Sequence, residues 1–100
     1  MPFFLKILAA PKDELLGVKI PLVEGENLIG RASPPCGIKL EGNKVSKKHC
    51  TLMVNKETLQ LKDLGSSNGI YLNGKKTGDS ALKAKDRLVI GEFTLEVTAG

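Results

Sequence analysis

Short apolar runs, separated every few residues by turn-forming residues, constrain the fold of this chain more than any other feature. In the clearest run, Phe93, Leu95 and Val97 alternate with polar residues, as in a strand with one buried face. No window carries apolar residues at i, i+3, i+4 and i+7 over a helical length. Eleven glycines and five prolines supply the turns between runs. The sequence therefore predicts an all-β sandwich.

The same pattern gives the expected strands along the chain. We expect them at residues 3–9, 18–20, 27–30, 38–40, 49–54, 58–62, 70–72, 88–90 and 93–97. Two prolines make residues 31–37 an irregular loop, and residues 75–80 are all polar. In the strand at 49–54, Cys50, Leu52 and Val54 share one face, and we assign Cys50 to the core. A chain of 100 residues forms one domain and buries roughly two-thirds of its unfolded surface.

The net charge and the targeting signals in the sequence restrict the class of binding partner only in part. The net charge of +4 admits an anionic partner, but charge alone does not separate nucleic acid from a phosphopeptide. Residues 1–6 carry no secretory signal, and no apolar run approaches the length of a membrane span. Two cysteines allow at most one disulfide. We expect an intracellular, reducing setting.

Catalytic and metal-binding patterns are weak. One histidine and two cysteines at no zinc-type spacing predict neither a metal site nor a cofactor. The segment from Gly69 to Lys75 matches most of a P-loop, but Lys76 stands where Ser or Thr is required. His49 and Cys50 are neighbours on a strand, so their side chains point to opposite faces and cannot form a nucleophile–base pair. We expect no enzymatic activity.

Basic and hydroxyl residues cluster instead in the loops. Arg31 follows a strand, Ser46 and Lys47 precede another, and Ser67 and Asn68 lie between two turn signals. If these loops meet at one end of the sandwich, a phosphate would find a guanidinium, two hydroxyls and an ammonium group, which suit charge-assisted hydrogen bonds. Asn68 can donate and accept at once, so it suits a peptide main chain.

Four motifs carry a resemblance to a known family. They are Gly30-Arg31, Ser46-Lys47-Lys48-His49, residues 63–69 (DLGSSNG) and residues 72–74 (LNG). In order and spacing they resemble those of the forkhead-associated domain, and the resemblance runs from the first strand to Val97. It implies a single domain over residues 1–100, an eleven-stranded, mainly antiparallel sandwich that binds phosphothreonine peptides with loops at one end. Because the motifs start close to Met1, we expect this domain to be the amino-terminal module of a longer protein.

The resemblance assigns a role to each loop residue. Arg31 is expected to contact the phosphate, Ser46 and Lys47 to bind its oxygens, and Ser67 to add a hydroxyl. Asn68 is expected to hold the peptide main chain just beyond the phosphothreonine.

Further roles follow from the same resemblance. Lys44 stands where the family often selects the third residue after the phosphothreonine, so we hypothesise a preference for an acidic residue there. Lys47 replaces the family's commoner arginine, which keeps the charge but loses the two-pronged hydrogen bond. The residues expected to be structural in the binding loops are Gly30, His49, Gly69 and Asn73.

The predicted function is a non-catalytic phosphothreonine-binding module that mediates phosphorylation-dependent protein interactions. Family analogy favours the nucleus, in DNA-damage or cell-cycle signalling, with the cytoplasm and bacterial kinase signalling as alternatives. A second hypothesis is nucleic-acid binding, although the absence of Trp and the presence of only one Tyr and three Phe leave few stacking platforms. A third is homodimerisation through a sheet face or an edge strand.

Overall fold

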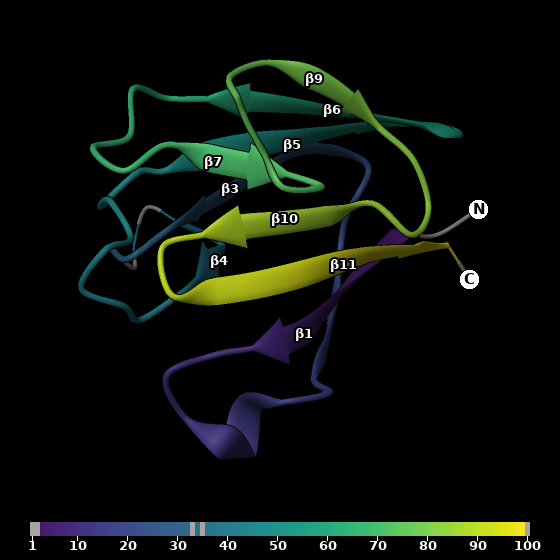
Figure 1. Cartoon of the computed structure of the whole chain (residues 1–100). Coiled ribbons are helices and arrows are strands. Elements are labelled where there is room, and N and C mark those ends of the chain that lie inside the picture. Colours follow the sequence, from purple (N-terminus) through teal and green to yellow (C-terminus); the bar gives the residue numbers. More distant parts are fainter. Residues whose placement is uncertain (1–2, 33, 35, 100) are drawn as a thin grey trace.

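Two β-sheets packed face to face form the domain, which Figure 1 shows as a computed structural model describing residues 3–32, 34 and 36–99. The six-stranded sheet has the order β2 (Lys19–Pro21), β1 (Phe3–Ala9), β11 (Phe93–Ala99), β10 (Arg87–Ile90), β7 (Ile70–Leu72) and β8 (Lys75–Thr77). The five-stranded sheet has the order β4 (Ile38–Lys39), β3 (Gly25–Gly30), β5 (Cys50–Asn55), β6 (Thr58–Asp63) and β9 (Ser80–Leu82). The predicted all-β, eleven-stranded sandwich is confirmed, and β3 with β4 is the parallel pair among the strand pairs described.

Alternation of apolar residues builds the core. Phe93, Leu95 and Val97 of β11 are at most 1% exposed, while the residues between them are half-buried. On the facing sheet, Cys50 and Leu52 of β5 are fully buried. Each large apolar side chain buried in this way contributes about 1.5–3 kcal/mol. Burial raises the pKa of the Cys50 thiol to about 12, so this group stays protonated, in agreement with its assignment to the core.

Several elements differ from the sequence-based expectation. Residues 75–77 form β8 although they are polar, because their backbone pairs with β7 at the sheet edge and little of their surface is buried. β9 also begins inside the polar segment, at Ser80. A short 3₁₀ turn, η1 (Asp13–Leu15), lies between the first two expected strands, where the hydrophobic pattern predicts no regular element. Among the described residues, η1 is the one helical element. It is too short and too polar to cross a membrane. Ser33 and Pro35 of the predicted 31–37 loop lie outside the described residues.

Strand register places the important loops at one end. Ile29 pairs with Cys50 and Cys50 with Asp63, so the end of β3, the start of β5 and the end of β6 lie side by side. In the other sheet Ile90 pairs with Ile70, which brings the end of β10 to the start of β7. The loops that follow or precede these positions therefore leave the sandwich together. They gather at the left of Figure 1, away from the two termini.

Candidate functional site

Gly30, the last residue of β3, lies directly against the loop that contains Ser46 and Lys47. The Arg31 N–H donates to the Ser46 carbonyl at 3.0 Å, and the Cys36 thiol donates to the Lys47 carbonyl at 3.1 Å. A Cβ on Gly30 would collide with that Lys47 carbonyl and lie 2.8 Å from the Cys36 sulfur. Glycine is therefore required here because two backbone segments approach each other closely.

The side chain of Arg31 is held at its inner end only. Its Nε–H donates to the Val45 carbonyl at 3.0 Å. The residue is exposed, and its terminal guanidinium nitrogens have no hydrogen-bond or ion-pair partner among the described residues. This arrangement orients the guanidinium and leaves its outer donors available for an anion.

His49 connects the loops of this end through four hydrogen bonds, although it is fully buried. The Ser46 N–H donates to its Nδ1 at 3.0 Å, and its Nε2–H donates to the Gly69 carbonyl at 2.9 Å. Its backbone N–H donates to the Ile29 carbonyl at 2.9 Å, and its carbonyl accepts the Leu64 N–H at 3.0 Å. These partners require the tautomer protonated on Nε2. His49 thus holds the β4–β5 and β6–β7 loops in one arrangement.

The β6–β7 loop meets the β4–β5 loop directly. The Ser67 N–H donates to the Ser46 hydroxyl oxygen at 3.1 Å, and the Asn68 side-chain NH₂ donates to the Lys44 carbonyl at 3.1 Å. Gly69, at a φ of 73°, ends the loop in the left-handed region that favours glycine. The Ser67 hydroxyl and the Asn68 side-chain oxygen have no partner among the described residues, so both can meet a ligand.

Glu92 supports the same loop, and the sequence did not single it out because it lies between two expected strands, at residues 88–90 and 93–97. Its carboxylate accepts the N–H groups of Asn43 at 2.8 Å and Lys44 at 3.0 Å. Burial by itself raises the pKa of Glu92, but the hydrogen bonds from the backbone of Lys44 and Asn43 outweigh it and hold the pKa below its usual value. A Cβ on the preceding Gly91 would lie 2.7 Å from a Val45 methyl group, so the β10–β11 turn packs tightly against this loop.

These loops surround three adjoining hollows. The middle one, called the central cleft, has a volume of about 110 Å³ and is lined by Arg31, Asn43, Lys44, Val45, Ser46, Ser67 and Asn68. A hollow of about 370 Å³ shares Arg31 and Asn43 with the cleft. Another, of about 240 Å³, shares Lys44 and Asn68 with it. The three hollows therefore adjoin one another at the loop end of the sandwich.

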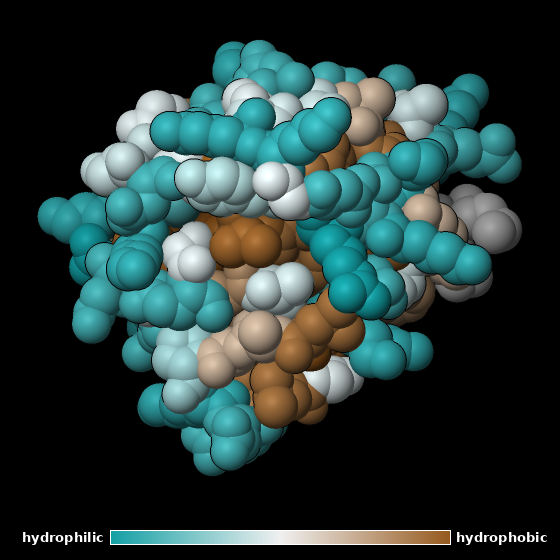
Figure 2. Space-filling view, in the orientation of Figure 1, coloured by the Kyte–Doolittle hydropathy of each residue, from teal (hydrophilic) through white to brown (hydrophobic). Residues whose placement is uncertain are grey.

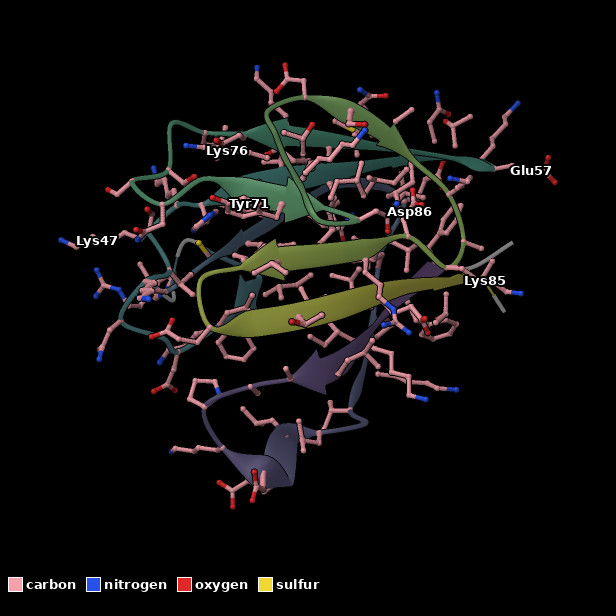
Figure 3. All side chains as sticks on the ribbon, in the orientation of Figure 1. Lys47, Glu57, Tyr71, Lys76, Lys85 and Asp86 are labelled. Carbon is pink, nitrogen blue, oxygen red and sulfur yellow. The ribbon has the colours of Figure 1, made fainter. Side chains whose placement is uncertain are left out.

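The structure brings together most of the residues that the sequence singled out. Arg31, Lys44, Ser46, Ser67 and Asn68 all line the central cleft. Lys47 lies outside that lining: its carbonyl faces inward, and Figure 3 shows its side chain at the tip of the loop end. Gly30, His49 and Gly69 are buried directly beneath the cleft loops.

Asn73 is not part of this group, which corrects its assignment to the binding loops. β7 carries the chain roughly 10 Å away from Gly69 before Asn73 is reached. There its side-chain NH₂ donates to Asp86 at 3.0 Å and its side-chain oxygen accepts the Arg87 N–H at 2.9 Å. Figure 3 shows Asp86 in the half of the molecule opposite Lys47. The Asn73 contacts therefore stabilise a distant turn.

Cations and hydroxyl donors dominate the cleft, and metal-binding groups are absent from the described part. Residues 3–32, 34 and 36–99 contain no cluster of three or more His, Cys, Asp or Glu side chains that could hold a metal ion. An exposed guanidinium, an ammonium and two hydroxyls around about 110 Å³ suit an anion of phosphate size. The fold and site define a β-sandwich module with a cleft of cationic and hydroxyl side chains on its end loops.

The family follows from comparison with known proteins. Residues 27–91, well over half of the chain, match the family model of the FHA domain. The chain therefore belongs to the forkhead-associated (FHA) domain family, and the resemblance stated from its motifs is confirmed.

Curated relatives are bacterial. The oxoglutarate dehydrogenase inhibitors of Corynebacterium efficiens and Corynebacterium glutamicum are 29% and 28% identical over 94 residues, which cover 94% of this chain. The chain spans slightly less than two-thirds of these relatives, 66% and 65% of their lengths.

Solved FHA domains share the fold. The FHA domain of a Chlamydia trachomatis protein superposes with a TM-score of 0.89 at 26% identity, covering 100% of this chain and 99% of that one. A domain solved in a study of phosphothreonine-dependent FHA interactions gives a TM-score of 0.88 at 25% identity, covering 100% and 98% of the two chains. The FhaA FHA domain, solved in complex with the intracellular domain of Rv3910, gives 0.83 at 26% identity, covering 95% and 98%.

Proposed function

We propose that this domain binds phosphothreonine-containing segments of partner proteins without chemically altering them. The observation that carries the proposal is the central cleft, where loops separated by up to 37 positions in the chain, from Arg31 to Asn68, converge around one phosphate-sized space. Membership of the FHA family, whose members bind phosphothreonine peptides, supports the same conclusion.

Each cleft residue has a chemical role in this proposal. Arg31 offers two parallel N–H donors to two phosphate oxygens, and Ser46 and Ser67 donate their hydroxyls. Hydrogen bonds of this kind to a charged group contribute about 1.5–3 kcal/mol each. Asn68 retains its side-chain oxygen for a peptide N–H, and Lys47 adds positive charge from the rim.

Binding without turnover is part of the proposal. The side chains that line the cleft are cations, amides, hydroxyls and one valine, which suit holding a ligand. His49 lies below the cleft, and both of its ring nitrogens are already engaged.

The biological setting is also part of the proposal. The curated relatives are bacterial and give no support to the nuclear, DNA-damage and cell-cycle setting favoured by family analogy. An intracellular location remains a prediction. Because similarity to oxoglutarate dehydrogenase inhibitors extends over 94% of this chain, we propose a metabolic enzyme as one candidate partner. Measuring the activity of such an enzyme with and without the domain tests whether a metabolic enzyme is the partner.

Titration with matched peptides tests the main proposal. One threonine-containing sequence is prepared unmodified, with phosphothreonine and with phosphoserine, and calorimetry measures each dissociation constant. We expect micromolar affinity for the phosphothreonine peptide, about −8 kcal/mol, because a flexible peptide loses entropy when it is ordered.

An arginine pair supplies the control. Arg31→Ala should weaken binding about 10- to 150-fold, the equivalent of losing about 1.5–3 kcal/mol. Arg87→Ala should leave affinity unchanged, because Arg87 faces Glu96 at 3.6 Å and does not line the cleft. Equal affinity for all three peptides, or no effect of Arg31→Ala, would refute the proposal. Sedimentation of the same samples and competition with an oligonucleotide check the homodimer and nucleic-acid alternatives.

A further inference from the structure

The loop that carries Asn68 contains a chemically labile pair of residues. Two of the five asparagines, Asn68 and Asn73, directly precede a glycine. Glycine has no side chain to shield its backbone nitrogen, so this nitrogen can reach the side-chain carbonyl carbon of the asparagine before it. Closure of that ring expels the side-chain nitrogen and begins deamidation. For the three remaining asparagines, a side chain on the next residue hinders the attack; they are Asn27, Asn43 and Asn55.

Asn73 is restrained against this reaction. Its side-chain NH₂ donates to Asp86 at 3.0 Å, and its side-chain oxygen accepts the Arg87 N–H at 2.9 Å. Its backbone N–H also donates to the Arg87 carbonyl at 2.9 Å. Asp86 is only 5% exposed, which strengthens the hydrogen bonds that it accepts. Both side-chain hydrogen bonds must break before the amide can turn toward Gly74.

Asn68 is restrained much less. The residue is exposed, and one hydrogen bond, from its side-chain NH₂ to the Lys44 carbonyl at 3.1 Å, holds the amide. Its side-chain oxygen and the N–H of Gly69 have no hydrogen-bond partner among the described residues. Figure 2 shows hydrophilic side chains over the left end of the molecule, where these loops gather, so water reaches this end. The Asn-Gly pair is therefore free to react at residues 68–69 and held at residues 73–74.

The fold also requires glycine after Asn68. Gly69 has a φ of 73°, in the left-handed region that favours glycine. A Cβ built there would lie 2.8 Å from the Lys76 Cε, because the Lys76 side chain extends from β8 over this position. A larger residue would strain the backbone and displace Lys76. The loop geometry that presents Asn68 to the central cleft thus depends on the residue that makes Asn68 labile.

We propose that Asn68 is a site of spontaneous deamidation and that the reaction switches off phosphopeptide binding. The Gly69 nitrogen loses its proton to water and forms a bond to the Asn68 Cγ. The bond from Cγ to the side-chain nitrogen breaks, and ammonia leaves with a proton taken from water. Water then opens the resulting succinimide at either of its two carbonyl carbons, which gives aspartate or isoaspartate. Water is the co-reactant, and nothing is oxidised or reduced.

The product changes the chemistry of the central cleft. A carboxylate cannot donate to the Lys44 carbonyl, so the hydrogen bond that joins the β6–β7 and β4–β5 loops is lost. The new negative charge also repels a phosphate and competes with it for Arg31 and Lys44, which line the same cleft. Isoaspartate in addition lengthens the main chain of the loop by one carbon atom. This consequence for binding rests on the proposed function, whereas the reaction itself does not.

Mass spectrometry of the aged domain tests the reaction. The domain is incubated at physiological temperature in neutral and in alkaline buffer and then digested with trypsin and chymotrypsin. Cleavage after Tyr71 puts Asn68 and Asn73 in different peptides. We expect conversion of the amide to an acid at Asn68, faster in alkaline buffer because the attacking nitrogen must lose its proton. Conversion at Asn73 should be at least about tenfold slower, because two hydrogen bonds must break first.

Variants test the consequence for binding. Asn68→Asp, which makes the aspartate product directly, should bind a phosphothreonine peptide at least about tenfold more weakly than the natural domain. It should also bind more weakly than Asn68→Ala, and this difference should shrink with added salt because it arises from charge. Asn55→Asp makes the same chemical change at an exposed position at the other end of β5 and should leave affinity within about twofold. Thermal unfolding checks that the variants fold.

The outcomes separate this proposal from the proposed function. Conversion confined to Asn68, together with weak binding by Asn68→Asp, would support the switch. Equal rates at Asn68 and Asn73, no conversion at Asn68, or natural affinity of Asn68→Asp would each overturn it and leave phosphothreonine binding intact. If no phosphothreonine peptide binds the natural domain, the proposed function and the switch both fail, even where mass spectrometry finds Asn68 converted.

Discussion

Gly30→Ala tests whether the site depends on the close approach of two backbone segments. The added methyl group would collide with the carbonyl of Lys47 and contact the sulfur of Cys36. That carbonyl cannot easily move, because it accepts the Ala32 N–H at 3.2 Å and the Cys36 thiol at 3.1 Å. We expect the β4–β5 loop to shift away from β3 and to carry Ser46 away from Arg31.

The cost of this substitution follows from overpacking. Inserting a methyl group into a packed region of this kind destabilises a protein by about 1–3 kcal/mol. For a domain of 100 residues, that energy corresponds to a fall in melting temperature of roughly 5–20 °C. Calorimetric or fluorescence-detected melting measures the stability. Titration with a phosphothreonine peptide, below the melting range, should show at least a tenfold loss of affinity.

Gly37→Ala is the matched control. Gly37 lies in the β3–β4 connection that follows Gly30, but a Cβ there meets no atom of the described residues within 4 Å, and its φ lies outside the left-handed region. We expect its stability and affinity to equal those of the natural sequence, or its stability to rise slightly because alanine restricts the unfolded chain. If Gly30→Ala behaves like Gly37→Ala, the close approach does not hold the site together.

Two further predictions concern buried polar groups at the two ends of the domain. His49→Ala leaves the Ser46 N–H and the Gly69 carbonyl without partners, so we expect a loss of about 2–5 kcal/mol in urea unfolding together with weaker peptide binding. Unchanged affinity in a folded variant would contradict the linking role of His49. Asp86→Asn should lower stability without affecting binding. Burial raises the pKa of Asp86, but hydrogen bonds from Lys83 and Asn73 outweigh it and hold the pKa below its ordinary 3.8. Because the folded-state pKa is the lower one, the stabilisation is present above about pH 4 and is lost as the pH falls through the folded-state value. The stability difference between natural and variant domains should therefore narrow in acid, and a constant difference from pH 7 to pH 2 would contradict this account.

The alternation of apolar and polar residues was sufficient to predict a strand wherever the alternating apolar side chains are buried in the core. The β1 and β11 strands were predicted because every second residue is apolar and faces the core, as the complete burial of Leu5 and Leu95 shows. β8 was missed because its residues are polar and its backbone is held by pairing with β7, which leaves no trace in hydrophobic periodicity. For the same reason, the sequence did not predict that Lys76 lies on a strand beside β7.

The sequence predicted which residues could form the binding site from their chemical character, but it did not predict which of them contact one another. Arg31, Ser46, Ser67 and Asn68 were singled out as hydrogen-bonding groups in loops, and strand register brings them to one cleft. Glu92 gave no signal, since a carboxylate in a turn is ordinarily solvated. Its two bonds to the β4–β5 loop exist only because the β10–β11 turn packs beside that loop.

By itself, the sequence determined the sandwich and the positions that only glycine can occupy in a turn, because these depend on neighbours a few residues away. The tertiary structure decided which loops share an end. In the folded domain, Asn73 lies away from the cleft and bonds to Asp86, and His49 is buried between two loops. The side chain of Lys76 lies over Gly69. Such contacts join residues far apart in the chain, and only the packing and register of the two sheets fix their distances.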